Sequence, residues 1–162
     1  MKRLGVLVTF TLSVAATPAL AGIADTPLPV LVAGQPTYHL YSVPGVIRGG
    51  GMETFFSCTS TDTATMQVGV EIFGSAGGAP VNDATAESLS VGPGGTVVFA
   101  TGPAVWIGVN GLVPAGSKGS ARILATSKKL ACNAFMADSG NAPPTSMSQL
   151  TIISKVKQKA AN

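Results

Sequence analysis

Apolar and polar residues alternate along much of the chain with a period of two, as they do in half-buried β-strands. Residues 65–73 show this most clearly, because Met66, Val68 and Ile72 fall on one face. Similar short runs occupy residues 29–32, 38–43, 53–59, 88–91, 96–100, 105–109, 121–126, 130–137 and 148–156. No segment shows helical spacing with caps. The pattern predicts an all-β fold, a single antiparallel β-sandwich of about seven to nine strands.

Gly- and Pro-rich segments separate these runs and predict the turns. Residues 48–51 are expected to form a turn, and residues 92–95 and 127–129 are expected to close two hairpins between the runs that flank them. The prolines before residue 38 predict an N-terminal extended segment at residues 22–37, followed by the β-sandwich domain at residues 38–156.

The first residues have the order of a secretory signal peptide. Lys2 and Arg3 precede an uncharged apolar run, and Ala19-Leu20-Ala21 provides the small residues of a cleavage site. We therefore expect a signal peptide at residues 1–21, a mature chain beginning at Gly22, and a periplasmic or extracellular (secreted) location. A membrane helix over residues 4–24 and cleavage after Ala24 are the alternatives, and no later stretch is apolar for long enough to span a membrane.

Removal of that segment changes the charge of the protein. The full chain has 162 residues, 10 basic and 7 acidic, and loss of Lys2 and Arg3 leaves a net charge of +1. This balance gives no reason to expect a nucleic-acid partner, which would need a concentrated basic surface. Residues 157–162 form a basic C-terminal tail. Its lysines either keep the chain soluble or make a weak contact with an anionic envelope surface.

Two cysteines, Cys58 and Cys132, remain in the mature chain. An even pair in an oxidising compartment is most simply a disulfide. The alternatives are that the two cysteines bind a metal ion or that one of them is a reactive thiol. The chain has no C-x-x-C motif, and one histidine, His39, is too few for a zinc site of the usual type.

Trp106 lies between these cysteines along the chain, and the order Cys58, Trp106, Cys132 resembles that of immunoglobulin domains. The chain is similar to small secreted bacterial immunoglobulin-like or fibronectin-like β-sandwich proteins of unassigned function. The resemblance covers residues 38–156 and implies a sandwich architecture for them.

The sequence departs from the immunoglobulin pattern at two places. Residues 72–73 stand where that family has its tryptophan, soon after the first cysteine, and Trp106 comes much later. Leu130 stands where the family has a tyrosine, two residues before the second cysteine. A likeness of fold does not carry an activity with it.

Catalytic signals are weak. His39 is the only histidine that could act as a general base, and no serine sits in a G-x-S-x-G motif. The acidic residues are scattered: Asp25, Glu53, Asp62, Glu71, Asp83, Glu87 and Asp138. We expect no catalytic residue, no cofactor and no metal site, and therefore no enzyme.

Four residues are candidates for contact with a partner. Trp106 points away from the Val105 face of its run, Arg122 alternates outward from the core as a contact or solvated residue, and the others are Tyr38 and Tyr41. The leading hypothesis is an exported, non-catalytic module with a structural or protein-interaction role, binding itself or an envelope component. A small-ligand or carbohydrate binder that uses exposed aromatic residues is the first alternative, and a hydrolase with an unrecognised site is the second.

Overall fold

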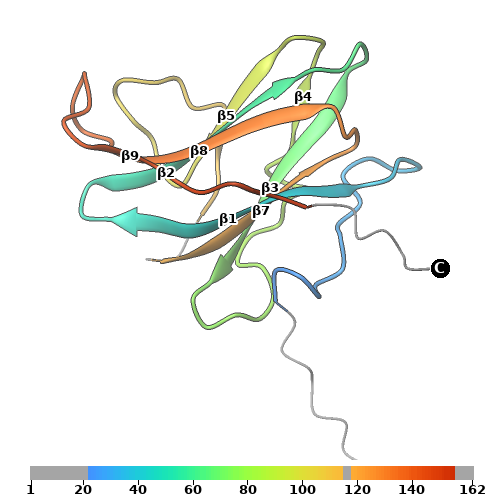
Figure 1. The fold of residues 1–162 in the computed structure, drawn as a ribbon, viewed down its shortest axis with the longest axis horizontal. Coiled ribbons are helices and arrows are strands. Elements are labelled where there is room, and N and C mark those ends of the chain that lie inside the picture. The colour runs from blue at the N-terminus through green and yellow to red at the C-terminus, as the bar shows by residue number, and fades with distance from the viewer. Residues whose placement is uncertain (1–21, 115–117, 156–162) are drawn as a thin grey trace, which may run out of the picture.

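A computed structural model describes residues 22–114 and 118–155 of the chain. These residues form ten strands and no helix, which confirms the predicted all-β class (Figure 1). The strands are β1 (Tyr38–Gly49), β2 (Met52–Ser60), β3 (Met66–Gly74), β4 (Leu89–Val91), β5 (Thr96–Ala100), β6 (Gly111–Leu112), β7 (Lys118–Ala125), β8 (Leu130–Asp138), β9 (Met147–Gln149) and β10 (Ile153–Ser154).

The ten strands belong to one sheet that folds round until it is nearly closed like a barrel. One part, the first half-sheet, has the order β10-β1-β7-β3-β4, and the other, the second half-sheet, has the order β9-β8-β2-β5-β6. The β1–β2 hairpin joins the two, with Arg48 opposite Glu53. All of these pairs are antiparallel except β5–β6, which is parallel.

The main core lies between the two half-sheets and follows the alternation of the sequence. Met66, Val68 and Ile72 on β3 are buried, as predicted, and they belong to the same apolar cluster as Phe56 on β2 and Phe99 on β5. The opposite faces of the strands are the outer faces of the sheet.

The chain reverses where the sequence predicted, but the two expected hairpins are wrong. Residues 92–95 join β4 to β5, and residues 127–129 join β7 to β8, so both connections pass from one half-sheet to the other. Turn residues mark a reversal without determining which neighbour the next strand pairs with. The predicted turn at residues 48–51 does close a hairpin, and Gly49, Gly50 and Gly51 have positive φ there.

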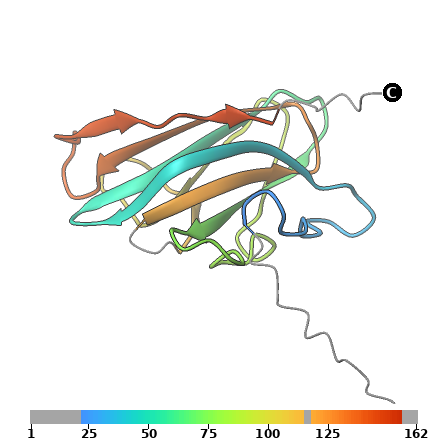
Figure 2. The same cartoon turned by 60° about the horizontal axis from the view of Figure 1, so that its bottom comes forward.

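The C-terminal run predicted at residues 148–156 is divided into two short strands. β9 pairs with β8, and β10 then pairs with β1, so the segment passes from the edge of one half-sheet to the edge of the other. Figure 2 shows β9 and β10 in red along one edge of the molecule. The runs at residues 29–32 and 105–109 are not strands but parts of loops and turns.

The predicted signal peptide at residues 1–21 and the predicted basic tail at residues 157–162 lie outside the described residues. Among residues 22–114 and 118–155, no helix is long and apolar enough to cross a membrane.

Candidate functional site

The predicted disulfide is confirmed, and it joins two neighbouring strands. Cys58 on β2 lies directly opposite Cys132 on β8, with 4.1 Å between their Cα atoms. Both strands belong to the second half-sheet, so the bond does not link the two half-sheets across the core. Cys58 is buried, whereas Cys132 borders a polar pocket of about 440 Å³ that Asn133 and Gln149 also line.

Arg122 is buried on the outer face of the first half-sheet, so its expected exposure is wrong. Only 1% of its side chain is exposed, and its Nε donates to the carboxylate of Glu71 on β3. The guanidinium also lies over the ring of Phe73, 5.2 Å from its centroid. Such a buried cation is tolerated because its donors are satisfied by a carboxylate and by carbonyl oxygens.

Those carbonyl oxygens belong to the N-terminal segment, residues 22–37. The Nη atoms of Arg122 donate to the carbonyls of Thr26 at 2.8 Å, Pro27 at 2.9 Å and Ile23 at 3.4 Å. A tight turn begins this segment, in which the carbonyl of Gly22 accepts from the backbone N–H of Thr26 at 3.0 Å. Arg122 therefore fastens the start of the described chain onto the sheet, and this is why it is not available at the surface.

Trp106 covers part of the outer face of the second half-sheet, and like Arg122 it is hydrogen-bonded to a backbone carbonyl. Its indole packs against Phe55 and Phe135, with ring centroids 5.1 and 6.0 Å away, in an apolar cluster separate from the main core. The indole N–H donates to the carbonyl of Asp138 at 2.7 Å. Trp106 is thus half-buried and hydrogen-bonded, while its neighbour Val105 is 68% exposed.

The structure does not gather the aromatic contact candidates into one patch. Tyr41 donates its hydroxyl proton to the carbonyl of Leu130, at the start of β8, whereas Trp106 reaches Asp138 at the other end of that strand. The ring of Tyr38 lies under the ammonium of Lys128, 4.6 Å from the centroid. Tyr38, Tyr41 and Trp106 therefore do not form one shared aromatic surface.

His39 has neighbours that do not suit a catalytic base. Its Nε2 lies 3.0 Å from the Ser42 hydroxyl, and its Nδ1 lies 3.3 Å from the ammonium of Lys155. Burial, together with the positive charges of Lys155 and Arg122, lowers the pKa of His39 from 6.5 to about 4. In a Ser-His-Asp triad a carboxylate holds Nδ1, whereas here a cation occupies that position.

Three aspartates accept hydrogen bonds from loop residues: Asp62 joins two loops, Asp83 bonds within its own loop, and Asp138 at the end of β8 bonds to the loop that follows. Hydrogen bonds, first from the Ser127 hydroxyl and then from the Thr63 backbone N–H, lower the pKa of Asp62 to about 2. The pKa of Asp83 is lowered by Thr85, and that of Asp138 by the backbone of Ser146. Within the described residues, no three histidine, cysteine or acidic side chains group as metal ligands.

One edge of the second half-sheet is exposed and carries no charge. Met147, Ser148 and Gln149 of β9 are all exposed, and β9 is the outermost strand beside β8. Residues 139–154 contain no charged residue, between Asp138 and Lys155. We call residues 145–150 the uncharged edge. The sequence already showed its lack of charge, but only the strand order shows that it lies at an edge.

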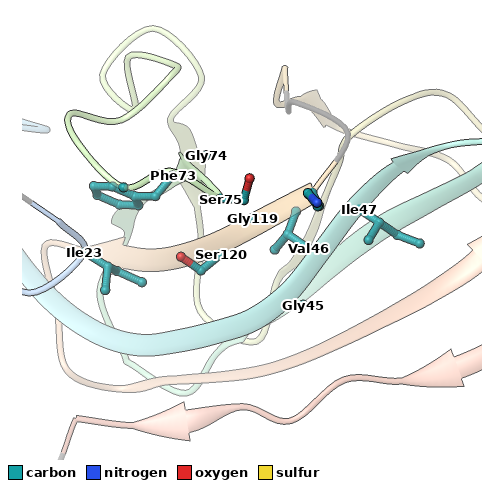
Figure 3. A pocket seen from close by; sticks show the side chains of 11 residues that line it. Ile23, Gly45, Val46, Ile47, Phe73, Gly74, Ser75, Gly119 and Ser120 are labelled. Atoms are coloured by element: carbon teal, nitrogen blue, oxygen red, sulfur yellow. The ribbon is translucent and has the colours of Figure 1, made fainter.

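A second candidate site is a hollow of about 490 Å³ on the outer side of the first half-sheet (Figure 3). Its lining combines β1, β3, β7 and the N-terminal segment. The lining residues are Ile23, Gly45, Val46, Ile47, Phe73, Gly74, Ser75, Gly77, Lys118, Gly119 and Ser120. Sequence reasoning missed this site because the residues come from four separate segments that only the register brings together.

Comparison of the chain with family models, with curated proteins and with solved structures gives no significant match. Function is therefore inferred from the geometry of the uncharged edge and of the hollow.

Proposed function

We propose that the mature chain is an exported, non-catalytic β-domain that acts by protein contact, and that the uncharged edge pairs with the same edge of a second copy. The observation that carries this proposal is that β9 is an exposed edge strand without charge. Exposed edges present unpaired backbone groups that invite another strand.

Soluble proteins usually protect such an edge with lysine, proline or a bulge. Residues 145–154 contain neither charged residues nor proline. The backbone N–H of Leu150 donates to Ala134, and the carbonyl of Ser146 accepts from Asp138, so these residues direct their peptide groups toward β8. By the alternation of a strand, the peptide groups of Met147 and Gln149 point away from β8, toward a partner.

A second copy fits this edge because two identical neutral strands do not repel each other. In an antiparallel pairing with Ser148 on a twofold axis, Met147 of one copy would lie opposite Gln149 of the other. Each such pair would exchange two backbone hydrogen bonds. A contact of this kind is isologous and closes as a dimer.

Three features support the exported, sandwich-like part of the proposal. The disulfide suits an oxidising compartment. Gly22, the residue after the expected cleavage site, takes part in a turn in which its carbonyl accepts from the backbone N–H of Thr26. The two half-sheets face each other across one core, as in an immunoglobulin-like or fibronectin-like sandwich.

The test is native mass spectrometry of the mature, oxidised protein, with two edge variants. Gln149→Pro removes an N–H that faces away from β8, and Met147→Lys introduces a charge at the edge. We expect a dimer that both variants convert to monomer, while Ser90→Lys on β4, at a different edge, leaves it intact. A protein that stays monomeric up to about 100 μM would overturn the pairing of two copies.

A further inference from the structure

The hollow in the first half-sheet lies beside a point where two adjacent strands carry glycine at the same level. Gly119 of β7 lies opposite Gly74 of β3, and on its other side it lies opposite Val46 of β1. A Cβ atom at Gly119 would overlap the carbonyl oxygen of Phe73, so only glycine fits there. The alternation that buries Ile72 and Ala121 in the main core turns Gly74 and Gly119 toward that core as well. Phe73 and Ser120 lie on the outer face, where the hollow opens.

Apolar residues border this hollow, among them Phe73, which is 2% exposed, and Val46, whose side chain is fully buried in the main core. Figure 3 shows Phe73 and Ile23 on one side and Val46 and Ile47 on the other, with Ser75 and Ser120 between them. The volume of about 490 Å³ falls within the range of small-molecule sites. Ile23 belongs to the segment that Arg122 fastens, so this wall is held in place by the buried Arg122–Glu71 pair.

The lining contains one formal charge, the ammonium of Lys118. Lys118 is exposed and forms no ion pair with any residue that the structure describes, and no acidic residue lines the hollow. The hydroxyls of Ser75 and Ser120 add hydrogen-bond donors. An apolar cavity with one cation and two hydroxyls is complementary to a molecule with an apolar chain and a single anionic head.

We propose that the hollow binds a free single-chain carboxylate, of the fatty-acid class. The chain would lie between Ile23, Phe73 and Ile47, and the carboxylate would meet the ammonium of Lys118. This site is separate from the uncharged edge on β9, and it does not depend on the pairing of two copies. Binding of a single-chain carboxylate would be a second role, beside the proposed contact with a second copy of the protein.

The test is a calorimetric titration of the mature protein with dodecanoate, dodecanol and dodecylamine, each below its micelle concentration. We expect saturable binding of one dodecanoate per chain, weaker binding of dodecanol, and the weakest binding of dodecylamine. Shortening the chain to decanoate should weaken binding about fourfold per methylene removed, because less apolar surface is buried. Dodecanoate that binds without saturation, or no more tightly than dodecylamine, would overturn the proposal.

Variants separate the role of the charge from that of the cavity. Lys118→Met should weaken dodecanoate binding about tenfold and leave dodecanol binding unchanged. The matched control, Lys128→Met, removes an exposed lysine beside Tyr38 and should change neither. Equal loss in the two lysine variants would show that net charge alone attracts the ligand, and would overturn a specific role for Lys118.

Ser120→Phe should fill the hollow and abolish binding of both the acid and the alcohol. The fluorescence of Trp106, on the other half-sheet, reports whether this variant is folded. If Ser120→Phe does not fold, Ser75→Phe should fill the same hollow from the residue that follows β3. A folded filled variant that still binds dodecanoate with unchanged affinity would place the ligand elsewhere and refute the site.

Discussion

The guanidinium of Arg122 donates to the carboxylate of Glu71 on the neighbouring strand, and both side chains are almost completely buried. Removal of one member leaves the other charged and unpaired in a region of low dielectric. We expect Arg122→Met to lower the free energy of unfolding by about 3–5 kcal/mol, measured by urea denaturation. The double variant Glu71→Leu/Arg122→Met should recover part of this loss, because it leaves no unpaired charge.

The same substitution should also release the N-terminal segment. Residues 23, 26 and 27 accept hydrogen bonds from Arg122, so Arg122→Met should accelerate amide hydrogen exchange in residues 22–30 more than in the β2–β8 pair. A loss below about 1 kcal/mol, with unchanged exchange in this segment, would contradict the anchoring role of Arg122.

The mature chain is expected to begin at Gly22. Cleavage after Ala24 would remove the Gly22 carbonyl, which accepts from Asp25 at 3.2 Å and from the backbone N–H of Thr26 at 3.0 Å. It would also remove the Ile23 carbonyl from Arg122. The intact mass of the exported protein distinguishes the two sites, and a main species that starts at Asp25 would contradict this prediction.

Trp106 should report on the second apolar cluster, because it is the only tryptophan in the chain. Its half-buried indole predicts a native emission maximum at shorter wavelength than that of a solvated tryptophan, shifting red on unfolding. Trp106→Phe keeps an aromatic ring but loses the hydrogen bond to Asp138, so it should cost about 1 kcal/mol. Trp106→Ala should cost several times more, since it also opens the contacts with Phe55 and Phe135. Equal losses in the two variants would contradict the packing role.

His39 should make the protein less stable as the pH falls from 6.5 to 4. Its folded pKa of about 4 lies below its ordinary value of 6.5, so the unfolded state binds more protons in this range. The free energy of unfolding therefore decreases on acidification, and His39→Gln should reduce that slope. The depressed pKa of Asp62, about 2, acts in a lower window, below pH 4. An NMR titration of the single histidine with a midpoint near 6.5 would contradict this prediction.

The strands were predictable where alternation coincides with burial. On β3, Val68 and Val70 face the main core, and the sequence alone indicates this face. Alternation also placed Arg122 on the face opposite Ile123, and this is correct. It could not show that residues 22–37 cover that face, because the covering segment lies almost one hundred positions away in the chain.

The run around Trp106 shows that alternation can also predict a strand where the structure has a loop. Val105, Ile107 and Val109 alternate like a strand, but the backbone N–H of Val105 donates to Ser139 instead of joining a ladder. Gly102 and Pro103 precede the run and Gly108 interrupts it. These loop residues lie over an apolar outer face that no local pattern reveals. The candidate sites were hidden for the same reason, because an edge and a hollow are properties of strand order and register.

The position of the disulfide also determines how the domain would respond to mechanical load. Cys58 and Cys132 are 74 residues apart in sequence but adjacent in space. A force applied to the two ends of the mature chain would therefore bypass every residue between them. At about 3.4 Å per residue, an oxidised molecule would lengthen by on the order of 250 Å less than a reduced one. Strands β3 to β7 would bear no tension while the bond is intact. The load would fall on β1, on β2 as far as Cys58, and on the chain from Cys132 through β8, β9 and β10.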